Sequence, residues 1–99
     1  MKIAVIGCGY WGPNLIRNFY QSNRVEGLIC CDLDQKRLDH LKTLYPGIKT
    51  QTDYRTLLDL SDLGGVVIAT PVRTHYPLAK EFLLKKRQNS AMFQGLGSF

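Results

Sequence analysis

The amino-acid sequence predicts an α/β fold with a doubly wound parallel sheet. Short apolar segments alternate with segments of helical periodicity, and this pairing repeats four times within 99 residues. Short apolar segments are typical of strands covered on both faces, and their alternation with helices is typical of parallel strands joined by right-handed crossovers. The predicted strands cover residues 2–6, 25–31, 48–50 and 64–70.

Capping residues predict where the helices between these strands begin. The first helix covers residues 15–20, and Asp34 opens the second. Thr52 or Asp53 caps a short third helix, and Thr74 caps the last one. The expected inward-facing residues are Leu15, Ile16 and Phe19, then Leu38, Leu41 and Leu44, then Leu57, Leu58 and Leu60, and finally Leu78, Phe82 and Leu83.

The composition is that of an ordinary globular domain, with 44% hydrophobic and 21% charged residues. The apolar run at the start is about five residues long, which is too short for the core of a signal peptide. No segment approaches the ~20 apolar residues of a membrane-spanning helix. We therefore expect a cytoplasmic chain without a membrane partner.

Cys8, Cys30 and Cys31 predict buried free thiols rather than a disulfide framework. Their number is odd, adjacent cysteines rarely bridge each other, and two of the three end an apolar run. No Cys-x-x-Cys motif or Cys/His cluster indicates a metal site, so we expect no bound metal.

The net charge of +5 raises nucleic-acid binding as a candidate function. Most of the excess lies in one short segment, where Lys80, Lys85, Lys86 and Arg87 outnumber Glu81. A basic segment without interleaved aromatic residues is more often the solvated face of a helix than a nucleic-acid footprint. We therefore expect no nucleic-acid partner.

Gly7, Gly9 and Gly12 form a G-x-G-x-x-G motif between the first predicted strand and the first predicted helix. In that context the motif predicts a dinucleotide cradle. Gly7 permits a tight turn, Gly9 leaves room for a pyrophosphate, and Gly12 lets the helix pack closely on the sheet. Pro13 suits the first turn of a helix, whose free N–H groups face the phosphates. A glycine-rich turn without a ligand is the other interpretation.

Asp32 ends the second predicted strand, where a dinucleotide site places an acid for the ribose hydroxyls. A 2′-phosphate about 4 Å from this carboxylate would feel roughly 4 kcal/mol of repulsion per charge at an effective dielectric constant near 20. This repulsion favours NAD over NADP, unless Arg37 or Lys36 moves in to compensate. The alternative is a turn or helix-cap aspartate, although Asp34 is better placed for the cap.

The loop after the fourth predicted strand lies at the same edge of the sheet as the glycine motif. Parallel strands present their carboxyl ends together, and ligands bind there at the topological switch point. Thr70, Pro71 and His75 in this loop are therefore expected to face the cofactor crevice. For His75 alone, a helix-cap or surface histidine is an equally good interpretation.

Three motifs together resemble the N-terminal domain of the Gfo/Idh/MocA oxidoreductase family. They are VIGCGYWGPN, CCDLDQKRL and VVIATPVRTHYPLA, and the resemblance runs from residue 1 to about Lys85. The Tyr-Trp-Gly-Pro-Asn variant is similar to members that act on nucleotide-linked sugars. The resemblance implies a Rossmann fold that binds NAD or NADP, with a larger C-terminal domain holding the sugar.

The resemblance also implies roles for individual residues, all of them cofactor contacts. The main chain of Tyr10 and Trp11 would contact the pyrophosphate, and Asp32 would bind the adenosine ribose. Arg37 would lie along the adenine. The nicotinamide side would be bordered by Thr70, Pro71 and His75.

The chain departs from the family pattern after residue 88. In the family a fifth strand and a catalytic Glu-Lys-Pro motif follow, whereas this chain reads KKRQNSAMFQGLGSF to its last residue. We therefore expect an incomplete dinucleotide-binding domain at 1–88, an atypical tail at 89–99, no substrate domain and no catalytic residue. The predicted sheet is a truncated Rossmann sheet of about four to five strands.

This ending predicts an uncovered edge on the fourth strand. An apolar edge is a template for pairing with other strands. Either residues 91–94 fold back as a substitute strand or cover, or a second chain covers the edge and forms a homo-oligomer. The alternative is a disordered tail after about Gln88.

The sequence thus predicts the NAD(P)-binding domain of an oxidoreductase. The implied reaction transfers hydride between a carbon of a sugar or nucleotide sugar and the nicotinamide. The chain alone is expected to bind nucleotide without turnover, because the half that positions the second reactant is missing. The alternative is a truncated, non-catalytic nucleotide-binding or interaction module.

Overall fold

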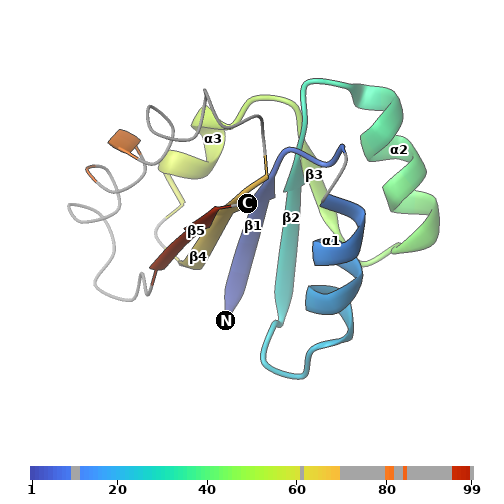
Figure 1. Ribbon diagram of the computed structural model, residues 1–99, viewed down its shortest axis with the longest axis horizontal. Helices are drawn as coiled ribbons and strands as arrows, with labels where there is room; N and C mark the ends of the chain where they lie inside the picture. The colour runs from blue at the N-terminus through green and yellow to red at the C-terminus, as the bar shows by residue number, and fades with distance from the viewer. Residues whose placement is uncertain (10–11, 61, 70–79, 82–83, 85–94, 99) are drawn as a thin grey trace.

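A five-stranded parallel sheet forms the centre of the molecule, in the strand order β3-β2-β1-β4-β5 (Figure 1). The computed structural model describes residues 1–9, 12–60, 62–69, 80–81, 84 and 95–98. The elements in chain order are β1 (Lys2–Ile6), α1 (Gly12–Gln21), β2 (Gly27–Cys31), α2 (Gln35–Leu44), β3 (Lys49–Gln51), α3 (Arg55–Leu58), β4 (Leu63–Ile68) and β5 (Gly95–Ser98).

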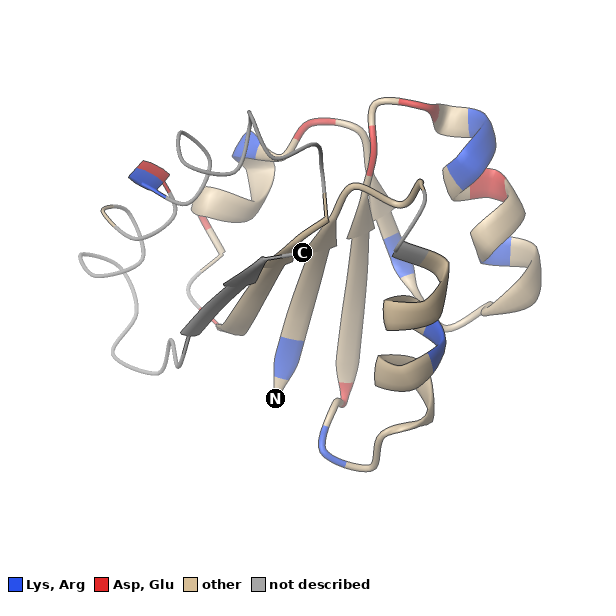
Figure 2. Ribbon diagram, viewed as in Figure 1, with Lys and Arg blue, Asp and Glu red and all other residues tan. Residues whose placement is uncertain are grey.

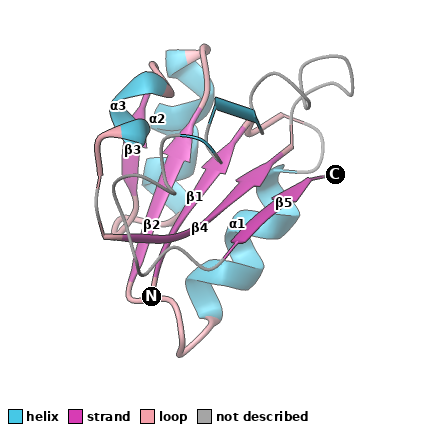
Figure 3. Cartoon of the chain, turned by 90° about the vertical axis from the view of Figure 1, so that its left-hand side faces the viewer, coloured by secondary structure: helices cyan, strands magenta, loops and turns pink. Residues whose placement is uncertain are grey.

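The sheet is covered on both faces, which confirms the doubly wound α/β prediction. Alternate residues of β1 enter two separate cores, with Val5 in one and Ile6 in the other. The first core contains Ile16 of α1 and Leu38 of α2, so these two helices cover one face. The second contains Leu57 of α3, which lies on the opposite face (Figure 3).

Local side-chain chemistry sets the ends of α2 as the sequence predicts. The carboxylate of Asp34 accepts a 2.9 Å hydrogen bond from the N–H of Lys36, so Asp34 is the N-cap. On the inner face of α2, Leu38 and Leu41 are buried, whereas Leu44 is 55% exposed. The expectation that Leu44 faces inward is therefore wrong.

Helix boundaries differ from the prediction at α1 and α3. The first helix begins at Gly12 rather than residue 15, and it includes Pro13 in its first turn as expected. The third is a single turn that ends at Leu58, and Leu60 follows it. It is short because the N–H of Leu60 bonds to the carbonyl of Leu57, which closes the turn after three residues.

The tail after residue 88 contributes a strand to the sheet. β5 pairs in parallel with β4, with Gly65 opposite Gly95 and Ile68 opposite Ser98. The predicted substitute strand therefore exists, but at 95–98 rather than 91–94, which lie outside the described residues. β4 is flanked by β1 and β5, so its edge is not uncovered, and of the two predicted ways of covering it the chain's own tail is the one that the structure has.

A register shift interrupts the pairing of β1 with β4. Lys2 lies opposite Leu63 and Ile3 opposite Gly65, so Gly64 is an extra residue in β4. A Cβ atom at Gly64 would lie 2.4 Å from Cγ of Met1, so the methionine side chain fills the space that a side chain at Gly64 would need.

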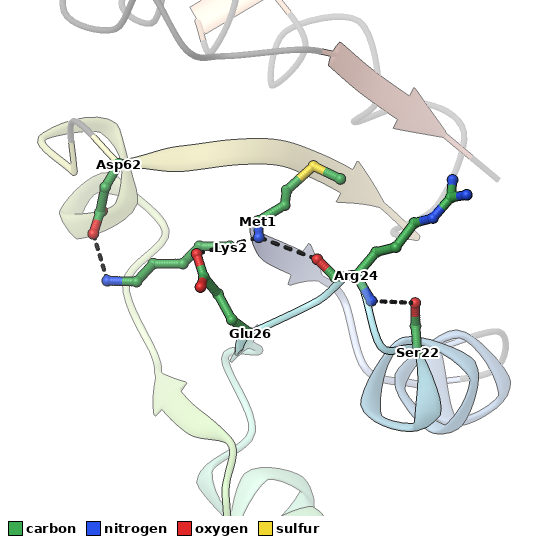
Figure 4. Close-up of polar contacts among 6 residues, drawn as sticks. All are labelled: Met1, Lys2, Ser22, Arg24, Glu26 and Asp62. Carbon is green, nitrogen blue, oxygen red and sulfur yellow. Dashed lines mark hydrogen bonds and ion pairs between the residues drawn. The ribbon is translucent and has the colours of Figure 1, made fainter.

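The amino-terminal ends of the strands are joined by polar contacts (Figure 4). The ammonium group of Lys2 in β1 donates to the carboxylate of Asp62, directly before β4. This hydrogen bond and the opposite charges raise the pKa of Lys2 and lower that of Asp62. These contacts lie at the end of the sheet opposite the glycine motif.

Among the helices that the structure describes, none has the length and apolar character to cross a bilayer.

Candidate dinucleotide site

The turn after β1 is the first component of the site. Gly7 has a φ of 91°, which is the one positive φ among the described residues. An L side chain is strained there, so a glycine is required at this turn. The N–H of Gly7 donates a 2.8 Å hydrogen bond to the carbonyl of Cys31, the last residue of β2, so the first residue of the turn is still paired with the sheet.

Asp32 ties this turn to the beginning of α2. Its Oδ2 accepts a 2.8 Å hydrogen bond from the N–H of Cys8, and its Oδ1 accepts one of the same length from the N–H of Asp34. The side chain of Asp32 is only 9% exposed. Asp32 therefore has the turn role that we weighed as an alternative, and an ionised carboxylate still retains free lone pairs for a ligand.

Arg37 lies across the space between Asp32 and Gly9. One guanidinium nitrogen, Nη1, is 3.7 Å from Oδ2 of Asp32, and Nε is 3.8 Å from Oδ2 of Asp34. The same Nη1 lies 3.2 Å from the position that a Cβ atom on Gly9 would take. Figure 2 shows acidic and basic residues together where β2 passes into α2.

The end of β4 joins the same edge of the sheet. The N–H of Ala69 donates a 2.8 Å hydrogen bond to the carbonyl of Ile6, the residue before Gly7. Ala69, the residue before Thr70, therefore lies beside the glycine turn. Thr70, Pro71 and His75, like Tyr10 and Trp11 of the glycine motif, lie outside the described residues, and Gly12 is the first residue of α1.

The three cysteines are buried free thiols, as predicted. A hydrogen bond with Cys30 and burial raise the pKa of Cys8, and burial and nearby Asp32 raise the pKa of Cys31 to about 12. Protonated, buried thiols are poor nucleophiles and poor metal ligands. In the part of the chain that the structure describes, no group of three His, Cys, Asp or Glu side chains could hold a metal ion.

Two features of the site were not predicted from the sequence. One is the main-chain N–H of Cys8, whose role depends on the turn geometry and not on the side chain. The other is Leu33, which is 91% exposed between Asp32 and Asp34 at the rim of the site. Its exposure could have been predicted from the sequence, because an apolar residue between two aspartates in a loop has charged neighbours on both sides.

The fold and the site define a nucleotide-binding α/β domain: the glycine turn, the acid after β2 and Ala69 at the end of β4 lie together at the carboxyl ends of the central strands. Residues 1–89 match the family model GFO_IDH_MocA, described as "Oxidoreductase family, NAD-binding Rossmann fold". The chain belongs to this family, and it is an NAD(P)-binding Rossmann domain.

Three relatives illustrate the match. "Glycosyl hydrolase family 109 protein 2" of Shewanella sp. (strain ANA-3) is 32% identical over 96 residues, covering 85% of this chain and 20% of that protein. A crystal structure of an oxidoreductase from Agrobacterium radiobacter, in complex with NAD+, L-tartaric acid and magnesium, has a TM-score of 0.75 and 28% identity. The alignment covers 87% of this chain and 25% of the Agrobacterium radiobacter protein.

The third is the WlbA dehydrogenase from Bordetella pertussis in complex with NADH and UDP-GlcNAcA. Its TM-score is 0.77 at 20% identity, and the alignment covers 98% of this chain and 27% of that one. The likeness at this identity concerns the fold. The chain spans about a fifth to a quarter of the length of these relatives.

Proposed function

We propose that this chain binds NAD as the dinucleotide-binding domain of an oxidoreductase that transfers hydride between a carbon of a sugar or nucleotide sugar and the nicotinamide. The observation that carries the proposal is the convergence of Gly7, the Cys8 N–H and Asp32 at one edge of a sheet of this family's fold. Relatives named as a glycosyl hydrolase and as a dehydrogenase holding a UDP-sugar support a carbohydrate substrate.

In this proposal the pyrophosphate lies over Gly9 and the start of α1. The first N–H groups of a helix have no partners within the helix, so they bind phosphate oxygens together with the positive end of the helix dipole. Gly12 begins that helix, and the main chain of Tyr10 and Trp11 supplies further donors. Thr70, Pro71 and His75 border the nicotinamide.

Asp32 accepts hydrogen bonds from the adenosine ribose hydroxyls and favours NAD over NADP. Its carboxylate is held in place by the Cys8 and Asp34 N–H groups, so it is oriented before the ligand arrives. A fixed, nearly buried negative charge repels a 2′-phosphate more strongly than a solvated one does.

Residues 1–88 form the dinucleotide-binding domain and 89–99 an atypical tail in this proposal. These 99 residues contain no Glu-Lys-Pro motif, and the family match already takes up residues 1–89, so this chain alone binds nucleotide without turnover. Three buried free thiols suit a reducing compartment, which supports a cytoplasmic location.

A glycine-to-alanine pair tests the phosphate cradle. Gly9→Ala adds a Cβ atom where the pyrophosphate must approach, and among the described residues this atom meets the flexible end of Arg37 at 3.2 Å. Gly47→Ala is the matched control, because its Cβ meets the hydroxyl of Tyr20 at the same 3.2 Å, in the loop after α2. Neither glycine has a positive φ.

Titration of NADH fluorescence should show a Kd about tenfold or more higher for Gly9→Ala, which corresponds to about 1.4 kcal/mol, and no change for Gly47→Ala. Thermal unfolding should give similar melting temperatures for both variants. If Gly9→Ala binds NADH as tightly as the control does, the phosphates do not lie over Gly9 and the proposed cradle is wrong.

A further inference from the structure

We propose that Arg37 closes the empty dinucleotide site, and that the ligand's ribose must displace this guanidinium from Asp32 in order to bind. The inference rests on the proposed function, because it concerns the same site. Arg37 therefore lowers the affinity of the site for the dinucleotide, because the ligand must first move its side chain.

The position of the guanidinium carries the inference. Nη1 of Arg37 lies 3.2 Å from the place of a Cβ atom on Gly9, so it fills the space that the glycine leaves free. The same nitrogen is 3.7 Å from Oδ2 of Asp32. A pyrophosphate over Gly9 and a ribose on Asp32 would both overlap the guanidinium where it now lies.

The two charged partners differ in how firmly they are held. Asp32 is 9% exposed and accepts 2.8 Å hydrogen bonds from the N–H groups of Cys8 and Asp34, so its carboxylate is fixed by the main chain. Arg37 is 55% exposed and approaches Asp32 no closer than 3.7 Å. When a ligand enters, the arginine therefore moves and the aspartate stays.

Asp34 gives the displaced side chain a partner outside the cradle. Nε of Arg37 is 3.8 Å from Oδ2 of Asp34, whose side chain is 48% exposed. Rotation about the outer bonds of the arginine releases Nη1 from Asp32 while the contact with Asp34 persists. Displacement thus exchanges one long ion pair, exposed only on its arginine side, for hydrogen bonds between Asp32 and the ribose.

Removal of the arginine side chain should therefore favour binding. Long ion pairs with a flexible, solvated partner such as Arg37 shift an equilibrium by about twofold to fivefold, so Arg37→Ala should lower the Kd for NAD by about that factor. Loss of one positive charge weakens the attraction of any anion, so the effect must be measured against Lys36→Ala. That control removes the same charge from the neighbouring exposed position of α2.

The experiment has one arm without nucleotide and one with it. In the ligand-free chain, ¹H–¹⁵N NMR should show a larger shift of the Gly9 amide in Arg37→Ala than in Lys36→Ala. Calorimetric titration with NAD should then give a Kd for Arg37→Ala about twofold to fivefold below that of Lys36→Ala. Both results together support the inference.

A Gly9 amide that does not respond to Arg37→Ala would overturn the inference, and so would a Kd equal to or higher than that of Lys36→Ala. In the second case nucleotide still binds, so the proposed function stands, and a higher Kd would show that Arg37 holds the ligand. A chain that shows the Gly9 response but binds no nucleotide in any variant would overturn the proposed function, and the role of Arg37 with it.

Discussion

The main-chain N–H of Cys8 donates a 2.8 Å hydrogen bond to the carboxylate of Asp32, so the glycine turn after β1 is tied to the residue that follows β2. The second oxygen of this carboxylate holds the N–H of Asp34 before α2. One side chain therefore joins two successive β–α connections of the sheet. Any change at Asp32 acts on the shape of the site as well as on its charge.

Asp32→Ala should lower the free energy of unfolding by about 1–3 kcal/mol, because two N–H groups lose their acceptor in a nearly buried place. Urea unfolding measures this change. Asp39→Ala is the control. Among the described contacts, the exposed carboxylate of Asp39 accepts a hydrogen bond from the side chain of Gln35 and from no main-chain N–H group. If both variants are equally stable, Asp32 does not act as a structural link.

The same substitution tests the discrimination between the two dinucleotides. Asp32→Ala should weaken the binding of NAD and narrow its margin over NADP, because the repulsion of the 2′-phosphate is removed together with the ribose contact. Titrations of both ligands against the unchanged chain and the variant measure the margin. Equal affinities for NAD and NADP in the unchanged chain would contradict the role of Asp32.

The pairing of Lys2 with Asp62 predicts a pH-dependent contribution to stability. The hydrogen bond from Lys2 holds the pKa of Asp62 below its usual value of 3.8, so the pair stabilises the fold above this pH and loses that effect as the pH falls through the lowered pKa. The raised pKa of Lys2 implies a second loss as the pH rises above 10.5. Near neutral pH the pair is intact.

Urea unfolding at several pH values should therefore show Asp62→Asn to be less stable than the unchanged chain near pH 7, and the difference should vanish in acid. High salt should also reduce the difference, since both groups are exposed. Asp39→Asn removes a carboxylate that faces a neutral amide and provides the comparison. A difference that persists unchanged in strong acid would rule out this ion pair as the cause.

Pairing of β4 with β5 predicts slow amide exchange on that side of the sheet. Amides within residues 65–68 that bond to β5 should be protected in the full chain, and a chain that ends at residue 94 should exchange them at least about tenfold faster. Amides shared by β1 and β2, such as those near Ile29, should keep their protection. Free exchange at residues 66–68 in the full chain would show that β5 does not cover β4.

The sequence predicted the order of the strands and the start of α2 because both follow from local patterns. β1 has the predicted bounds, and Asp34 caps α2, since an apolar run and an aspartate before a helix act over a few residues. The start of β2 was two residues too early, because Val25 bonds back to Ser22 in a turn. That turn depends on where the preceding helix stops.

The part of the site that was missed depends on contacts distant in sequence. Cys8 and Asp32 are 24 residues apart, and their contact requires the assembled sheet. The placement of Arg37 beside Asp32 and Asp34 also depends on the folded connection between β2 and α2, because a long, flexible side chain takes the position that its charged neighbours offer. The tail strand was predicted four residues too early, because its pairing partner is β4 and the tail itself has weak strand propensity.

The extra residue at Gly64 has a consequence for how β4 divides its side chains between the two layers. Leu63 and Ile68 belong to the same core although an odd number of positions separates them, which a regularly alternating strand does not allow. The inserted glycine resets the phase of the strand. If β4 paired regularly through Gly64, Leu63 would point into the opposite layer, so at this point a residue without a side chain decides where a neighbouring leucine is buried.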